Sequence, residues 1–199
     1  MRHSSSTGGI EVPVLQALSP KLPYRNSLSL GNQAVRTVWN VAYVLFYRPS
    51  PRAFHGWRRF LLRLFGASIA PTAHAYPRAR VFAPWNLTMK DHSCLADDVD
   101  CYSVDHVILG VHATVSQYAY LCTATHDYTD PEFPLVTRPI VLDDYCWVAA
   151  GAFVGPGVVV GSGAVIGARG VVVRNVEEWT VVAGNPAKFV KRRIMRAAV

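Results

Sequence analysis

The sequence predicts a mainly β protein, a parallel β-helix built from six-residue repeats. An aliphatic side chain falls on every sixth residue from Leu142 to Val172, and a second column of mostly small side chains follows four positions behind. A period of six fits neither an α-helical turn nor the two-residue alternation of a long strand. It suits short strands that stack coil on coil, so that the same columns point inward on every coil. Charged residues are also few, at 17%, against 51% hydrophobic residues, which suits walls that bury one another. The aliphatic column is Leu142, Val148, Val154, Val160, Ile166 and Val172, and the other is Cys146, Ala152, Val158, Ala164 and Gly170.

Two helices are predicted ahead of the repeats. Residues 1–31 are rich in Ser, Gly and Pro, and we expect a flexible N-terminal segment there. Residues 32–66 carry apolar side chains at helical spacing, with Pro49 ending the first helix and Ser50–Pro51 starting the second. We expect the apolar faces of this helical cap to cover the first coil, and the arginines of the second helix to face solvent. The alternative is that residues 32–65 contact an anionic membrane, because apolar faces flanked by arginines are typical of interfacial helices.

The repeat region, residues 67–173, is predicted to contain one large interruption. The six-residue step begins at Ile69 and slips by two residues twice. Between Leu121 and Leu142 lie 21 positions (142 − 121), three more than three repeats use. The loop at 123–139 must therefore project from a regular wall, and functional residues often lie on loops held by a rigid scaffold. Residues 174–199 are expected to form a C-terminal segment with a short basic helix.

Charge and composition limit the partners and the location. The formal net charge is +7, with basic clusters at 48–63 and 188–196. No nucleic-acid motif or interleaved aromatic platform accompanies them, so we expect no nucleic-acid partner. No apolar run approaches the roughly 20 residues that span a bilayer, and the first 13 residues lack the features of a signal peptide. We therefore expect a cytoplasmic protein. The four cysteines form no CxxC pair, which favours reduced structural thiols.

His126, at the root of the predicted loop, is the strongest candidate for chemistry. A neutral imidazole is the usual side chain that takes a proton from a hydroxyl near neutral pH. Several histidines in the repeat region also raise a zinc hypothesis, but no three of them converge in the predicted coils, and we expect no metal site. Asp97, Asp98 and Asp100 could bind sugar hydroxyls or could form a solvated turn, and the sequence leaves both readings open.

Several motifs in order resemble one family. They are FHGWRRFLLRLFGA at 54–67, APWNLTM at 83–89, DDVDCY at 97–102, YLCTATHDYTDPEFPL at 120–135 and AGNPAKFVKRR at 183–193. Together with the six-residue repeats, they resemble the hexapeptide-repeat acyltransferases, and among these the colanic acid biosynthesis acetyltransferase branch. The resemblance covers roughly residues 35 to 193.

The resemblance implies a left-handed β-helix that assembles as a homotrimer, with acetyl-CoA between neighbouring solenoids. It implies that His126 is the general base for direct attack of an acceptor hydroxyl on the thioester. Trp147 matches a tryptophan beside the pantetheine, and the Ala150 amide matches a donor to the thioester oxyanion. Ala168 is expected to contact the cofactor as well.

The resemblance also implies sites for the charged ends of both substrates. Arg174, Lys188 and Lys191 match basic positions near the CoA phosphates, and the basic C-terminal tail independently suits a polyanion. Asp98 falls near an Asn that orients the acceptor in the sugar acetyltransferases of this family. We expect Asp100, Asp127 and Tyr128 to add contacts to the saccharide.

The sequence therefore predicts an acetyl-CoA-dependent O-acetyltransferase acting on a sugar hydroxyl, in exopolysaccharide or lipid-linked saccharide assembly. A location at the inner face of the membrane stays open as an alternative to a freely cytoplasmic one. Alternatives are the same chemistry on a small molecule such as serine or an antibiotic, a γ-carbonic-anhydrase-like zinc enzyme, and a solenoid without activity that serves assembly.

Overall fold

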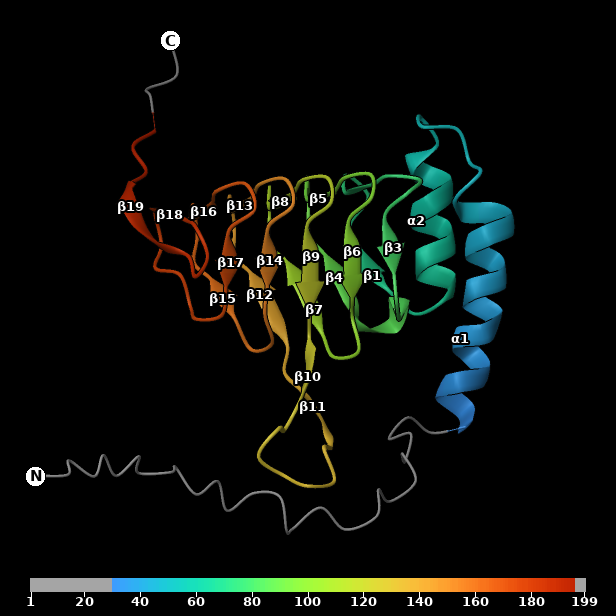
Figure 1. Cartoon of the computed structure of the whole chain (residues 1–199). Coiled ribbons are helices and arrows are strands. Elements are labelled where there is room, and N and C mark those ends of the chain that lie inside the picture. Colours follow the sequence, from blue (N-terminus) through green and yellow to red (C-terminus); the bar gives the residue numbers. More distant parts are fainter. Residues whose placement is uncertain (1–29, 196–199) are drawn as a thin grey trace, which may run out of the picture.

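The structure is a computed structural model that describes residues 30–195 (Figure 1). Short strands wind into a solenoid of five three-stranded coils and the start of a sixth, with two helices at one end. The predicted β-helix with an N-terminal helical cap is confirmed. The flexible segment expected over residues 1–31 lies outside the described residues, apart from the two that begin the first helix.

Three sheets, parallel except for the last strand of sheet B, form the walls of the solenoid. Each coil contributes one strand to sheet A, then one to sheet B, then one to sheet C. Sheet A holds β1 (Ser68–Ile69), β4 (Leu87–Met89), β7 (Val107–Leu109), β12 (Ile140–Leu142) and β15 (Val159–Val160). Sheet B holds β2 (His74–Ala75), β5 (Cys94–Leu95), β8 (Thr114–Val115), β13 (Trp147–Val148), β16 (Val165–Ile166), β18 (Thr180–Ala183) and β19 (Lys188–Arg192). Sheet C holds β3 (Arg80–Val81), β6 (Asp100–Tyr102), β9 (Tyr120–Cys122), β14 (Phe153–Val154) and β17 (Val171–Val172).

The two columns predicted from the sequence form the core. Every residue of both columns is buried. The two register slips are confirmed as longer coils: Ser68 pairs with Thr88, 20 residues on, whereas Val141 pairs with Val159, 18 residues on. A 3₁₀ turn, η3 (Pro84–Asn86), takes up the first extra pair at the corner between sheets C and A. Two additional residues per coil therefore alter only that corner and leave the inward columns aligned.

The cap consists of α1 (Leu30–Ala42), which continues as the π-helical turn η2 (Tyr43–Tyr47), and α2 (His55–Leu64). The second helix starts later than the predicted Ser50–Pro51. The reason is that the Ser50 hydroxyl donates to Tyr47 O and accepts from Arg58, so this serine closes the turn after η2 instead of capping α2.

The cap completes the hydrogen bonding of the first coil. In the walls, several N–H groups of each coil donate to carbonyls of the next coil, as His74 does to Ser93. Carbonyls of the first coil therefore face the cap without a preceding coil, and side chains of the cap supply the donors. These bonds run from Arg63 Nε to Ile69 O (2.9 Å), Arg59 Nη1 to Ala73 O (3.0 Å), Arg58 Nε to Ala75 O (2.7 Å), Tyr47 OH to Tyr76 O (3.2 Å) and Trp39 Nε1 to Val81 O (2.7 Å).

The expectation that the arginines of α2 face solvent is wrong for Arg58, whereas Arg63 is exposed as expected. Arg58 is fully buried, and Arg59 and Arg63 reach back to the coil. The carbonyls at the end of the sheet are covered by the cap and cannot reach water. A buried carbonyl without a donor is costly, and the N–H groups of a guanidinium supply that donor. Part of the apolar surface points outward instead, and Phe54 and Phe60 are more than half exposed.

The short C-terminal helix expected in residues 174–199 is also corrected. Residues 188–192 form β19, antiparallel to β18. β18 is the last parallel strand, so its open edge needs a partner, and this edge outweighs the weak helix propensity of a five-residue basic segment.

No helix within the described residues is long and apolar enough to cross a membrane. The four cysteines are free thiols, as expected. Burial raises the pKa of Cys94 to about 11 and the pKa of Cys101 to about 12.

Candidate active site

The loop predicted at 123–139 is a β-hairpin that leaves the solenoid between β9 and β12, at the corner of sheets C and A (Figure 1). Its strands are β10 (Ala124–His126) and β11 (Leu135–Thr137). Buried Thr123 clamps the root: its hydroxyl donates to Tyr102 O at 2.8 Å, and its carbonyl accepts from Arg138 N at 2.9 Å. The hairpin therefore projects from a fixed point of the wall.

His126 ends β10 and is held in one tautomer. Its Nδ1 lies 2.8 Å from Phe133 O. Because a carbonyl can only accept, Nδ1 carries the proton and Nε2 keeps its lone pair. The Phe133 ring stacks on the imidazole, with centroids 4.5 Å apart and an interplanar angle of 8°. Within residues 30–195, His126 Nε2 makes no hydrogen bond, so it is free to accept a proton from a ligand.

Phe133 was missed by sequence reasoning. Its φ of 50° lies in the left-handed region, which is uncommon for a bulky residue and often marks a functional site. This conformation accompanies a carbonyl directed at His126 and a ring that covers the same imidazole. The one available signal was its place between Pro131 and Pro134 in the interrupted repeat.

The two candidate acceptor residues next to His126 differ in their freedom to bind. Asp127 Oδ1 accepts from the Thr129 hydroxyl at 2.6 Å and from Thr129 N at 2.9 Å. The hydrogen bonds from Thr129 lower the pKa of this exposed carboxyl, which is engaged in its own turn. Tyr128 is 84% exposed and remains available to a ligand.

Sheet B carries a row that links Trp147 to the basic C-terminal strand. Trp147 pairs in register with Val165, Val165 with Val181, and Val181 with Lys191. Three interstrand steps separate the ends of this row, which amounts to about 14 Å. The Trp147 Nε1–H donates to Ser116 Oγ at 2.9 Å, which fixes the indole against the wall while it stays 46% exposed. Lys188, also exposed, lies on the same strand as Lys191.

Ala150 and Ala168 stack at the corner between sheets B and C. Arg169 N donates to Ala150 O at 2.9 Å, which joins the two turns. The Ala150 N–H donates to no group in the described part of the chain, and the residue is exposed. Trp147, Ala150, Ala168 and the two lysines therefore share one side of the solenoid.

The remaining candidates lie elsewhere in the chain. Arg174 is exposed just after β17, at the corner from which the hairpin leaves. Asp98 lies in the turn between β5 and β6, and Asp100 is the first residue of β6; they pair with Arg78 (2.8 Å) and Arg80 (3.6 Å), respectively. Burial raises the pKa of Asp100. One chain thus brings neither these carboxylates nor sheet B to His126, because the hairpin leaves from the corner opposite sheet B.

In the described part of the chain, no group of three or more His, Cys, Asp or Glu side chains could hold a metal ion. His92 and His112 stack on each other at 4.7 Å, and His112 stacks on Tyr145 at 5.1 Å.

Known proteins resemble this chain in sequence over most of its length. The Escherichia coli (strain K12) protein WcaF, named as a colanic acid biosynthesis acetyltransferase, is 37% identical over 164 residues, which cover 82% of this chain and 90% of WcaF. The chain belongs to the WcaF family of acetyltransferases. The Shigella flexneri WcaF matches equally well. No family model matches the chain.

Solved structures share the fold of this WcaF-family chain. A maltose O-acetyltransferase from Clostridium difficile 630 superposes with a TM-score of 0.75 at 20% identity, over 84% of this chain and 90% of that one. A hexapeptide-repeat acetyltransferase from Vibrio cholerae O1 biovar eltor, complexed with acetyl coenzyme A, superposes with a TM-score of 0.74 at 21% identity, over 85% and 93%. These superpositions agree with the β-helix that the motifs predict for this chain.

Proposed function

We propose that this protein transfers the acetyl group of acetyl-CoA to a sugar hydroxyl during exopolysaccharide or lipid-linked saccharide biosynthesis. Membership in the WcaF family supports the reaction class. The observation that carries the proposal within this chain is the orientation of His126, whose Nδ1 is bound to a carbonyl and whose Nε2 is free.

In the proposed reaction, His126 Nε2 takes the proton of the acceptor hydroxyl as its oxygen attacks the thioester carbon. The tetrahedral oxyanion is stabilised by the Ala150 N–H, which has no competing acceptor within residues 30–195. The C–S bond then breaks, and the CoA sulfur receives the proton from the imidazolium. The products are the acetyl ester and free CoA, with His126 returned to its neutral form.

The proposed site is shared between chains of a homotrimer. His126 lies at the corner of sheets C and A, whereas Trp147 and Lys191 lie on sheet B. A neighbouring chain that packs its sheet B against this corner would bring them together, with acetyl-CoA along the row from Trp147 to Lys191. Exposed Trp147 supplies apolar surface for that contact.

Subunit complementation tests the shared site. His126→Ala and Trp147→Ala chains should each be inactive alone, and co-expression should restore part of the activity, because some sites then combine an intact His126 with an intact Trp147. Absence of restoration in mixed trimers contradicts the arrangement. Light scattering that gives a monomer mass at micromolar concentration contradicts it as well.

The proposed acceptor is a saccharide, held by Tyr128 and by carboxylates such as Asp98 and Asp100 of whichever chain faces the hairpin. The proposed location is the cytoplasm, at the inner face of the membrane if the acceptor is lipid-linked, with residues 32–65 as the region of contact. A screen of acetyl transfer from labelled acetyl-CoA to nucleotide sugars and polyprenyl-linked saccharides tests the reaction. Transfer to serine or an antibiotic alone, with no saccharide product, contradicts the acceptor class.

A further inference from the structure

The cap exposes an apolar face on the side away from the solenoid. Its members, here called the outer cap face, come from α1, η2 and α2, and each is more than half exposed. They are Val38 (59%), Val41 (53%), Phe46 (53%), Phe54 (55%), Phe60 (53%) and Leu64 (66%). The first coil is already covered by the opposite face, where Trp39, Tyr47 and Leu62 are buried. Capping the solenoid therefore does not account for the outer cap face.

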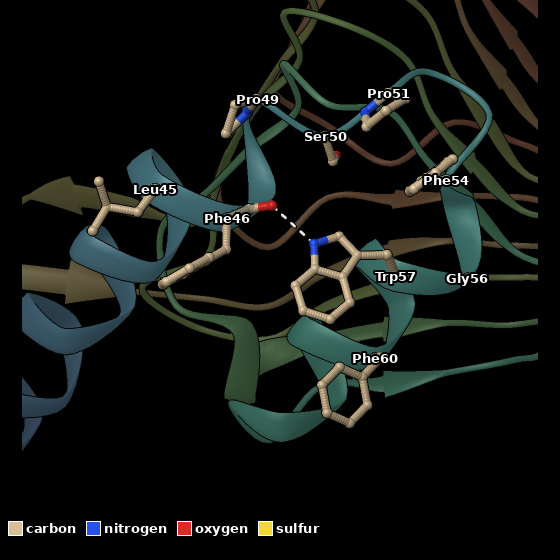
Figure 2. Close-up of a pocket in the computed structure, with 9 residues that line it drawn as sticks. All are labelled: Leu45, Phe46, Pro49, Ser50, Pro51, Phe54, Gly56, Trp57 and Phe60. Atoms are coloured by element: carbon tan, nitrogen blue, oxygen red, sulfur yellow. Dashed lines mark hydrogen bonds between the residues drawn. The ribbon is translucent and has the colours of Figure 1, made fainter.

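An open cavity of about 780 Å³ indents this face where η2 meets α2 (Figure 2). Phe46, Pro49, Phe54, Trp57 and Phe60 line most of it. The Trp57 Nε1–H donates to Phe46 O at 2.9 Å, which ties the two helical segments together across the cavity floor (Figure 2). The cavity is therefore a braced feature of the cap with walls that are largely hydrocarbon.

The charge of the cap that carries this face is of one sign. Residues 30–66 contain six arginines and no Asp or Glu, a net charge of +6 out of +7 for the chain. Arg58, Arg59 and Arg63 bind carbonyls, which leave their positive charge uncompensated. Arg52 alone pairs with a carboxylate, Asp97, at 3.2 Å. An occupant of the outer cap face must therefore be apolar at its centre and negative around it.

We infer that the outer cap face binds an anionic lipid bilayer, with Phe46, Phe54 and Phe60 entering the headgroup boundary. A bilayer offers hydrocarbon beneath a negative surface, which matches both the apolar centre and the arginines. A second copy of the same face fits poorly, because it would bring together two caps that contain arginines and no carboxylates. The inference deepens the proposed function by placing the enzyme where a lipid-linked acceptor resides.

The proposed trimer strengthens this binding. Solenoids that pack side by side around a threefold axis place all three caps at the same end of the assembly. Three outer cap faces then meet one membrane plane at once, so a weak single contact becomes a firm one through effective concentration.

Vesicle co-sedimentation of the full chain tests the inference. We expect binding to vesicles of phosphatidylcholine with phosphatidylglycerol, weaker binding to phosphatidylcholine alone, and loss of the difference at high salt. The double variant Phe54→Asp/Phe60→Asp should bind at least about tenfold more weakly, since each aromatic ring loses its transfer to hydrocarbon. Ile194→Asp, which changes an exposed apolar residue at the far end of the solenoid, should bind like the unchanged chain.

Three results would overturn the inference: no binding of the full chain to anionic vesicles, equal binding of the double variant, or concentration-dependent pairing of trimers that the double variant abolishes. Melting temperatures of both variants establish that they fold. Acetyl transfer to a soluble saccharide, measured without vesicles, separates the two proposals. The double variant should keep this activity, whereas a protein that binds vesicles but transfers no acetyl group refutes the proposed function and leaves membrane binding intact.

Discussion

The helical cap and the β10–β11 hairpin both lie outside the regular coils, and their key polar side chains differ in how many of their hydrogen-bonding groups are paired. In the cap, buried Arg58 donates to Ala75 O, Ser50 Oγ, Pro51 O and Arg52 O and contacts His55 Nδ1. In the hairpin, His126 has one ring nitrogen bonded and the other free of partners among the described residues. A saturated polar group stabilises its surroundings, whereas a group oriented by one bond and left with a free site can act on a ligand.

Replacing His126 by Ala should have the largest effect and should act on activity alone. Acetyl transfer should fall about 10²–10⁴-fold, the range for a lost general base. The melting temperature should change little, because the side chain lies outside the inward columns. Steady-state rates with a working acceptor and thermal denaturation measure the two quantities. Near-normal turnover removes His126 from the mechanism.

Replacing Arg58 by Met should have the opposite profile. Several acceptors at the base of the cap lose their donor in a buried site, which should lower the free energy of unfolding by about 3 kcal/mol or more. Arg48→Met, at an exposed arginine of the same cap, is the matched control and should stay within about 0.5 kcal/mol. Denaturant titration measures both. A comparable loss in the two variants would mean that overall charge, rather than donor pairing, stabilises the cap.

Trp39→Phe asks whether a single cap-to-coil bond matters. An aromatic ring remains, but Val81 O loses its donor at 2.7 Å and the smaller ring leaves a void in a buried site, so we expect a loss of about 2–3 kcal/mol in unfolding free energy. Activity per folded chain should be unchanged. An unchanged stability would show that water replaces this bond and that the cap is less tightly closed than its geometry indicates.

The double variant Lys188→Ala/Lys191→Ala tests whether the side chains of the exposed C-terminal strand bind a ligand, as proposed for the hairpin, or stabilise the fold, as those of the cap do. We expect the KM for acetyl-CoA to rise about tenfold, with a smaller change for the acceptor, because charge-assisted bonds to phosphate are lost. Arg192→Ala is the control on the same strand, since Arg192 is engaged with Glu177 at 3.1 Å. A defect confined to the acceptor, or one equal to that of the control, places the CoA phosphates elsewhere.

His55→Gln should produce the smallest effect, visible only as pH dependence. Burial and the neighbouring Arg58 lower the pKa of His55 in the folded protein. The unfolded chain, with a histidine pKa of about 6.5, therefore binds a proton first as the pH falls. Stability is fully present above that pKa and declines below it, and His55→Gln should make the decline shallower. Melting temperatures on either side of about pH 6.5 measure this, and parallel curves for the two proteins contradict it.

The sequence by itself determined the solenoid and its core. A strict six-residue period admits few alternatives, since each inward column must be apolar and of matched size on every coil. Leu142, Val160 and Cys146 are buried as that period requires. The interruption between Leu121 and Leu142 was readable for the same reason, because extra residues in a fixed period must leave the wall. The place of His126 at that interruption made it the candidate general base.

Only the tertiary structure decided where polar groups of the cap and the C-terminus point. A helical pattern shows that Arg58 and Phe60 lie on different faces of α2, but it does not show that unpaired carbonyls of the first coil draw the arginine inward. The strand at 188–192 depends likewise on the open edge of β18, which no local propensity records. The orientation of His126 rests on Phe133 O, a backbone acceptor seven residues away. In each case the deciding partner is a main-chain N–H or carbonyl group. Because nearly every residue type carries these groups, composition and spacing do not reveal which of them lacks a partner until the chain is folded.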